Sequence, residues 1–349
     1  MATCEVTEVN SGVTFTIDTN EIVLDGALAR GIKLPHQCRG ASCGTCKAKV
    51  LEGAVDHGWS FGFAINDAEK EQGLCLLCQA RPLSATLRVE TLQIASEGVS
   101  EISELDAEVL SNVALTPRVR RLVLALRRPV STVLPAGCYV EVCLPGISPH
   151  RMYSLAAPFA GDIGLVELFV ARHPQGRASG FIHDDLDPGA ALTIRGPFGT
   201  CRLPAGNGPV LGLAGGTGLA PVLAIFEAQL RSGCPDEFVL VLSVRESREV
   251  FALDRLEHLA RRYQNFGYRI LVTDEPSRYS TQPVLAPDWI RAHYPSLRGH
   301  RGVISGAPGF VEACAKTCQE LGMNSADIAT DGFTPVSAEL ALICPEPAG

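Results

Sequence analysis

Four cysteines carry the clearest chemical signal in the sequence. Cys38, Cys43 and Cys46 lie on one short loop, and Cys78 follows at a distance. The resulting C-x4-C-x2-C…C spacing is that of the thiolate ligands of a [2Fe–2S] cluster. A structural zinc site usually pairs two short C-x2-C knuckles, and here the second half offers only Cys75 and Cys78 within an apolar run. The spacing therefore favours one-electron redox chemistry, and Cys75 is expected to be a buried apolar thiol.

Two glycines and a histidine flank these ligands. Gly40 and Gly44 are expected to let the loop backbone wrap closely around an inorganic core, with amides that can donate to its sulfurs. His36 lies just before the loop. Because four cysteines are already available, His36 is interpreted as a surface residue and not as a ligand.

A second signal lies in the middle of the chain. Arg151, Tyr153 and Ser154 place a cation, a flat aromatic ring and a hydroxyl along one extended segment. Taken alone, a strand with a salt-bridged arginine would give the same pattern. The segment Gly176–Ser179, however, follows a strand that ends at Arg172, and its small residues and amides could hold a pyrophosphate at a helix start. The two segments together are typical of a flavin site.

A third signal is the glycine-rich stretch Gly212–Pro221, which lies between an apolar strand and a helix expected from Leu219. Glycines at a helix N-terminus let backbone amides approach a phosphate, and the helix dipole favours the anion. The stretch departs from the strict G-x-G-x-x-G pattern, and a tight turn without a ligand is the alternative. The strand-turn-helix placement favours a nucleotide.

These signals fall on segments with different periodicities. A length of 349 residues exceeds what one hydrophobic core usually supports, so two or three domains are expected. Short strands and one helix before and after the cysteine loop predict a small β-plus-helix unit, short strands between Pro and Gly turns predict an antiparallel barrel, and alternating strands and helices predict a parallel α/β sheet. The expected boundaries are 1–97, 104–206 and 207–335, with a connector over 95–104 and a tail over 336–349 that carries no usable motif.

The expected elements can be given by their ranges. The strands are Glu5–Val9, Val13–Ile17, Lys47–Leu51, Leu87–Leu92, Val119–Leu126, Tyr139–Leu144, Val166–Ala171, Ala191–Arg195, Val210–Ala214, Phe238–Val244, Tyr268–Thr273 and Gly302–Gly306, and the first two helices are Ile22–Gly31 and Asn66–Gln72.

Composition excludes several classes of protein. The chain has a net charge of −8, and residues 1–97 hold 12 acidic and 8 basic side chains, a net −4. Nucleic acid is therefore not expected as a partner. Thirteen cysteines, an odd count, with no secretory segment at the start, indicate a reducing cytoplasm and no disulfide framework. The charge-free stretch Leu203–Phe226 holds six glycines and three prolines, so no membrane span is expected.

In order along the chain, the three motifs resemble those of the ferredoxin–flavin–NAD(P)H reductase components of bacterial multicomponent oxygenases, such as those for naphthalene, benzoate or xylene oxidation. The resemblance covers nearly the whole chain. It implies a multidomain α+β and α/β protein with a β-grasp [2Fe–2S] ferredoxin domain, an antiparallel β-barrel FAD domain and a parallel α/β nucleotide-binding domain. It also implies that the cluster ligands are Cys38, Cys43, Cys46 and Cys78, and that the cofactor-binding residues are Arg151, Tyr153, Ser154, Arg172, Gly176, Ser179, Gly215, Gly216, Thr217, Gly218, Pro221, Arg245, Gly306 and Pro308.

The resemblance places three residues at the reacting groups: Ser154, Ser305 and Phe333. Ser154 would hydrogen-bond near the reactive flavin nitrogen, and Phe333 falls where an aromatic ring commonly lies near the flavin. Ser305 stands where many relatives have a cysteine that faces the nicotinamide. A serine hydroxyl can still donate a hydrogen bond, so we expect the exchange to tune hydride transfer and not to abolish it.

The resemblance implies a route from NADH through FAD and the cluster to a Rieske-type aromatic-ring dioxygenase or its ferredoxin. A nicotinamide releases two electrons as hydride and a [2Fe–2S] cluster accepts one at a time, so a flavin must stand between them. A di-iron monooxygenase or, less favoured, a cytochrome P450 is the alternative acceptor, and a redox or nucleotide sensor without turnover is the alternative function. Asp274 and Glu275 would repel a 2′-phosphate, which favours NADH, although Arg245 and Arg248 could supply positive charge for NADPH.

Overall fold

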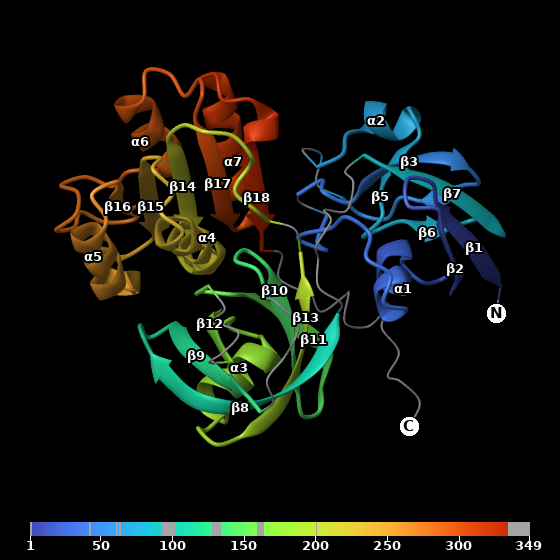
Figure 1. Cartoon of the computed structure of the whole chain (residues 1–349), viewed down its shortest axis with the longest axis horizontal. Coiled ribbons are helices and arrows are strands. Elements are labelled where there is room, and N and C mark those ends of the chain that lie inside the picture. The colour runs from blue at the N-terminus through green and yellow to red at the C-terminus, as the bar shows by residue number, and fades with distance from the viewer. Residues whose placement is uncertain are drawn as a thin grey trace. The chain divides into compact units, whose positions relative to one another are not determined.

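The computed structural model describes residues 2–41, 43–60, 62, 64–92, 102–127, 134–158, 164–199 and 201–333. The chain divides into two compact units, Met1–Glu101 with Phe198–Thr200, and Ile102–Pro197 with Cys201–Gly349. Figure 1 shows the elements of both units, coloured along the chain. Most of the predicted connector and all of the predicted tail lie outside the described residues.

The first unit is built on a mixed five-stranded sheet of order β2-β1-β7-β3-β5. Strands β1 and β7 are parallel, and every other neighbour in this sheet is antiparallel, which is the β-grasp arrangement expected from the resemblance. Strand β1 alternates exposed and buried residues, so that Cys4 and Val6 enter the core with Leu24 of helix α1. The elements are β1 (Thr3–Glu8), β2 (Val13–Asp18), α1 (Val23–Ala29), β3 (Lys47–Glu52), β4 (Val55–Asp56), α2 (Asp67–Glu71), β5 (Leu74–Leu76), β6 (Arg81–Pro82) and β7 (Thr86–Thr91).

The second unit begins with a six-stranded sheet of order β11-β10-β13-β8-β9-β12. A bridge between Leu155 and Leu168 connects its two outer strands, so the sheet curls into a barrel around an apolar core. Strand β8 is absent from the sequence prediction, although its first part alternates between buried and exposed residues; the prediction assigned its start to the connector between domains. The elements are β8 (Ser103–Ala114), β9 (Val119–Leu126), β10 (Tyr139–Leu144), β11 (Ile147–Ser154), β12 (Leu165–Ala171), α3 (Arg177–Asp184) and β13 (Ala191–Phe198).

The same unit continues into a five-stranded, all-parallel sheet of order β16-β15-β14-β17-β18 (Figure 1). Helices α4 and α5 share one apolar cluster with this sheet, and α6 and α7 share another, so both faces are covered. The elements are β14 (Val210–Gly215), α4 (Leu219–Arg231), β15 (Phe238–Val244), α5 (Leu253–Arg262), β16 (Phe266–Val272), α6 (Ala286–His293), β17 (Arg301–Gly306), α7 (Pro308–Glu320) and β18 (Ile328–Gly332), with short 3-10 turns η1 (Gly216–Gly218), η2 (Ser247–Glu249) and η3 (Ser325–Asp327).

The parallel sheet confirms the predicted α/β architecture but has one strand more than expected. Strand β18 has the sequence IATDG, in which only the first two residues are apolar. A strand with so few apolar side chains gives no periodic signal, and its place is determined by pairing with β17.

Helix α4 packs so closely on strand β14 that only a glycine fits at position 212. A Cβ atom on Gly212 would lie 2.6 Å from Cζ of Phe226 and 2.7 Å from Cγ1 of Val222. We therefore predict that Gly212→Ala lowers the free energy of unfolding by about 1–3 kcal/mol, because the helix must shift or its side chains must leave their rotamers.

Gly267→Ala is the matched control, since a Cβ on this strand β16 residue meets no atom within 4 Å. Its effect should stay within about 0.5 kcal/mol. Urea unfolding of the full chain would measure both, and equal stabilities for the two variants would contradict the close packing of α4 on β14.

Candidate functional site

The cysteine loop joins α1 to β3 and contains several residues in the left-handed backbone region. Gly44 has a φ of 71°, as expected for a glycine that turns the loop. Arg39 and Ala41, which are not glycines, have φ values of 49° and 57°, and they flank Gly40. Strained non-glycine residues persist only where the surroundings fix them, and they are common at functional sites. The amide of Gly40 donates to Sγ of Cys38 at 3.4 Å, as a loop that wraps around sulfur requires.

The four cysteine thiols lie in two pairs. A hydrogen bond with the Cys38 thiol, together with burial, holds the pKa of Cys43 well above its usual value. The Cys46 thiol and burial raise the pKa of Cys78 in the same way. Among the described residues, no three His, Cys, Asp or Glu side chains converge as a single-ion site would require. The Cys38 thiol also raises the pKa of Cys78, so the two pairs lie near each other. Two neighbouring thiol pairs fit a cluster of two irons, in which each iron takes two thiolates.

Two neighbours of the cluster loop have other roles. Cys75 lies in β5, and burial raises its pKa to about 12, so it is an inert apolar thiol as expected. The expectation that His36 is a surface residue is wrong. His36 is buried, its Nδ1 lies 2.7 Å from the carbonyl oxygen of Leu34, and burial is the main cause that lowers its pKa to about 4.

The flavin motif lies on the barrel strand β11. Successive side chains of a strand alternate between its faces, so Arg151 and Tyr153 share one face and Ser154 lies on the other. Burial lowers the pKa of Arg151, and the nearby cation of Arg177 adds to this effect. Burial also raises the pKa of Tyr153 to about 12. Two guanidinium groups placed near each other repel, and a pyrophosphate between them would relieve that repulsion.

The first turn of α3 completes this phosphate cradle. Gly176 is the N-cap, and no side chain caps the helix at this end. Ser179 shapes the preceding loop, because its Oγ accepts a hydrogen bond from the His173 amide at 3.0 Å and donates to the Gly176 carbonyl at 3.2 Å. A Cβ on Gly176 would lie 2.6 Å from that Oγ. The cradle therefore fits an anion at a helix N-terminus, with Arg177 as a contributor that the sequence prediction did not include.

The resemblance implies that Arg172 binds a cofactor, but in the structure its side chain points to a carboxylate. Its guanidinium binds both carboxylate oxygens of Asp184, at 2.6 and 2.7 Å. Asp184 is the last residue of α3, at the opposite end from Gly176. The structure therefore does not bring Arg172 together with the phosphate cradle.

The glycine-rich stretch connects β14 to α4 through the turn Gly216–Gly218. A Cβ on Gly218 would lie 2.2 Å from the carbonyl oxygen of Ser305, and one on Gly306 would lie 3.1 Å from Cα of Gly215. The loops that follow β14 and β17 are thus in backbone contact. Backbone in such contact leaves its outer amides open to a phosphate, as nucleotide-binding turns require.

The remaining nucleotide-motif residues lie around this contact. Pro221 is buried in the first turn of α4, and Pro308 is the first residue of α7. Thr217 lies within the turn η1 and is partly exposed. Phe333 follows β18, and its amide donates to the Gly306 carbonyl at 2.8 Å. Phe333 thereby lies next to the loop that follows β17.

Asp331 is the functional residue that the sequence prediction missed. The hydroxyl of Ser154 donates to Oδ2 of Asp331 at 3.1 Å, and the hydroxyl of Ser305 donates to the Asp331 carbonyl at 3.0 Å. All three residues are buried. The barrel and the parallel sheet therefore meet at this aspartate. Strands and helices alternate in this half, so a further strand could have been expected after α7, and Asp331 would have fallen within it.

The residues expected to discriminate between nucleotides lie after β15 and β16. Glu275 accepts a hydrogen bond from the Ser247 amide at 2.8 Å, and that bond lowers its pKa. Arg248 forms an ion pair with Glu246 at 2.6 Å, so its charge is already compensated. Arg245 has an exposed side chain, and its amide donates to Glu249 at 3.2 Å.

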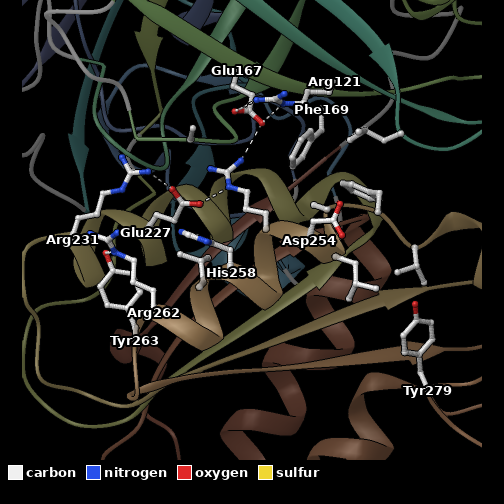
Figure 2. Close-up of a pocket in the computed structure, with 18 of the residues that line it drawn as sticks. Arg121, Glu167, Phe169, Glu227, Arg231, Asp254, His258, Arg262, Tyr263 and Tyr279 are labelled. Atoms are coloured by element: carbon white, nitrogen blue, oxygen red, sulfur yellow. Dashed lines mark hydrogen bonds and ion pairs between the residues drawn. The ribbon is translucent and has the colours of Figure 1, made fainter.

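A cavity of about 940 Å³ lies between the outer face of the barrel and helices α4 and α5, and Ser247 is among the residues that line it (Figure 2). None of the residues predicted to bind a cofactor lines it. In the part of the chain that the structure describes, no helix is both long and apolar enough to cross a bilayer.

Comparison with known proteins agrees with this geometry. Residues 6–83 match the 2Fe-2S iron-sulfur cluster binding domain, residues 106–203 the oxidoreductase FAD-binding domain, and residues 213–316 the oxidoreductase NAD-binding domain. The chain is 33% identical over 325 residues to the reductase subunit of an aromatic O-demethylase from Amycolatopsis, covering 92% of this chain and 96% of that one. It is 29% identical over 328 residues to the reductase component of phenol 2-monooxygenase from a Pseudomonas strain, covering 93% and 92%.

Solved structures give the same result. The crystal structure of an Amycolatopsis cytochrome P450 reductase superposes with a TM-score of 0.80 at 32% identity, covering 96% of this chain and all of the other. The ferredoxin reductase in carbazole 1,9a-dioxygenase superposes with a TM-score of 0.69 at 24% identity, covering 95% and 98%, and shares the fold. Three cofactor domains in the same order, together with a relative above 30% identity over nearly its full length, show that this chain belongs to the family of NAD(P)H-dependent, FAD- and [2Fe–2S]-containing reductase components of multicomponent oxygenase systems.

Proposed function

We propose that this chain takes hydride from NADH and delivers single electrons from its cluster to a separate oxygenase component or an intermediate ferredoxin. The observation that carries the proposal is the meeting of Ser154, Ser305 and Asp331 in a unit that also carries the phosphate cradle, while the other unit carries four cysteines in two pairs. Electron transfer from a two-electron donor to a one-electron centre requires both a flavin site and a cluster site. When bound, FAD accepts a hydride and releases its electrons singly.

Each proposed site residue has a separate task. Cys38, Cys43, Cys46 and Cys78 hold the cluster, and Arg151 with Arg177 neutralises the FAD pyrophosphate at the first turn of α3. Ser154, whose hydroxyl donates to Asp331, would lie near the reactive nitrogen of the flavin, and Ser305 and Phe333 would lie on the nicotinamide side. Backbone amides of Gly215–Gly218 hold the nucleotide phosphates at the start of α4.

We propose NADH as the preferred nucleotide. Glu275 is fixed beside the turn after β15 by the Ser247 amide, and Asp274 lies two residues after the end of β16. Two carboxylates at this edge repel a 2′-phosphate and can accept a hydrogen bond from a ribose hydroxyl. Arg248 offers little compensation because Glu246 neutralises it.

The proposed acceptor is an oxygenase component that acts on an aromatic compound, in the reducing cytoplasm. The sequence favoured a Rieske-type dioxygenase or its ferredoxin and ranked a cytochrome P450 last. The chain is 33% identical to an aromatic O-demethylase reductase and 28% identical to a naphthalene 1,2-dioxygenase reductase component. It is also 32% identical to a solved cytochrome P450 reductase. These identities favour a cytochrome P450 as the second candidate acceptor, beside a Rieske-type dioxygenase or its ferredoxin. Electron delivery to purified oxygenases of both classes would separate the two.

The first functional prediction concerns the order of the centres. Cys46→Ser should lose the cluster and cytochrome c reduction while it keeps FAD and NADH-dependent ferricyanide reduction, because the cluster and the flavin motif belong to different units. Iron and labile-sulfide analysis, together with the two assays, would measure this. Cys75→Ala is the control, since Cys75 is a buried thiol outside the two pairs, and it should keep the cluster. Loss of both activities from Cys46→Ser with FAD still bound would overturn the serial order.

The second functional prediction concerns Asp331. Asp331→Asn should keep FAD but slow its reduction by NADH about 10- to 100-fold, because the hydrogen bond from the Ser154 hydroxyl to Oδ2 of Asp331 is weakened. Anaerobic stopped-flow absorbance of the flavin would measure the rate. Asp327→Asn, in the turn before β18, is the control. A wild-type rate for Asp331→Asn would remove Asp331 from the site.

The third functional prediction concerns partner docking. Residues 1–97 carry a net charge of −4, so an acceptor with a basic surface is steered toward this unit over long range. We expect the second-order rate of electron delivery to the native acceptor to fall steeply as the Debye length shrinks to about 3 Å in 1 M salt, while flavin reduction by NADH changes little. Stopped-flow measurements of both steps across a salt series provide the check, and a salt-independent delivery rate would exclude electrostatic docking.

A further inference from the structure

One short segment of the parallel-sheet half makes repeated contacts with the barrel. We call residues 249–255, from the end of η2 to the first turn of α5, the clasp. Its Glu249 forms an ion pair at 3.4 Å with Arg118, directly before β9. Its Phe251 packs edge-to-face on Phe169 of β12, with ring centroids 5.2 Å apart.

The third contact of the clasp is made by Arg255, which lies at the centre of a network of five charged side chains. Arg255 forms ion pairs with Glu167 of β12 at 3.0 Å and with Glu227 of α4 at closer range. Glu167 also binds Arg121 of β9 at 2.9 Å, and Glu227 binds Arg231 at 2.8 Å. Figure 2 labels Arg121 and Glu167 at the top and Glu227 and Arg231 below them. Within this network, the ion pair between Arg255 and Glu167 is the contact that joins the parallel-sheet half to the barrel.

Burial gives these contacts more weight than surface ion pairs have. The Glu227 side chain is 3% exposed and the Glu167 side chain 12%. Ion pairs at exposed sites contribute little, whereas a buried carboxylate needs its partner in place. Phe169 and Phe251 also belong to one apolar cluster that spans both halves. The clasp is thus held by an apolar contact between two ion pairs.

The clasp is connected to both elements proposed to hold the nucleotide. Glu249 accepts a hydrogen bond from the amide of Arg245, the first residue after β15. Glu227 lies on α4, whose first turn follows Gly216–Gly218. Ala252, in the middle of the clasp, has a φ of 56°, a left-handed conformation that is costly for alanine and persists only where surrounding contacts impose it.

We propose that Glu249, Phe251 and Arg255 are positioning residues, which fix the nucleotide-binding turn of the parallel-sheet half against the flavin-binding barrel for hydride transfer. The proposal rests on the proposed function. Hydride transfer requires the two reacting atoms in a narrow range of separations, and a small misplacement by a distant residue lowers the rate strongly. The two halves carry the two reactants, so whatever holds the halves together sets that separation.

Glu167→Gln is the most direct test in the holoenzyme. It weakens the bond from Arg255 to the barrel and leaves the buried pair of Arg255 and Glu227 intact. We expect the flavin reduction rate at saturating NADH to fall about 10- to 100-fold, the Kd of NADH to change less than about twofold, and FAD content to stay at the wild-type level. Amide hydrogen exchange over residues 249–255, measured without NADH, should increase.

Arg121→Gln is the matched control, because Arg121 bonds to the same Glu167 but lies on the same barrel. It should leave the rate and the exchange at wild-type values. A Glu167→Gln enzyme with faster exchange but an unchanged reduction rate would overturn the positioning role, and so would an Arg121→Gln enzyme that is slowed equally.

If Glu167→Gln does not retain FAD, Phe251→Leu is measured in the same way with the same expected results. Failure of the wild-type protein to reduce its flavin with NADH would instead contradict the proposed function, while the exchange comparison still tests the clasp contacts.

Discussion

Asp331 receives hydrogen bonds from two serines that lie about 150 residues apart in the sequence, and the arrangement of the second unit depends on this convergence. Ser154 ends a barrel strand and Ser305 lies near the end of a parallel strand. Their meeting at one buried residue requires that the barrel and the parallel sheet present these ends to each other. The contact between Gly218 and the Ser305 carbonyl holds the neighbouring loops equally close.

The expected redox centres are divided between the two units of the chain. Three of the four cysteines lie on a loop whose Arg39 and Ala41 adopt left-handed backbone conformations, which persist only where the surrounding contacts impose them. The flavin and nucleotide motifs belong to the other unit. A division of this kind separates two-electron from one-electron chemistry, and it leaves the acidic first unit to meet an acceptor.

The cysteine spacing, the flavin tetrapeptide and the glycine-rich turn could be predicted from sequence because each is a local pattern with a local physical reason. Strands such as β9, β10 and β15 were predicted with their observed bounds, since they are continuous apolar or alternating runs. What sequence could not provide depends on distant partners. Asp331 is a single acidic residue in a weakly apolar strand, and Arg172 is oriented by Asp184 twelve residues away. His36 is buried although its residue type favours the surface.

The central claim is that electrons pass from NADH to FAD and only then to the cluster. Anaerobic stopped-flow mixing of the wild-type protein with NADH, recorded at wavelengths that separate flavin from cluster absorbance, tests it most directly. The account predicts that flavin absorbance is lost first, at a rate that depends on NADH, and that cluster absorbance follows in a later phase. Reduction of the cluster before the flavin, or at an unchanged rate in protein from which FAD has been removed, would contradict it.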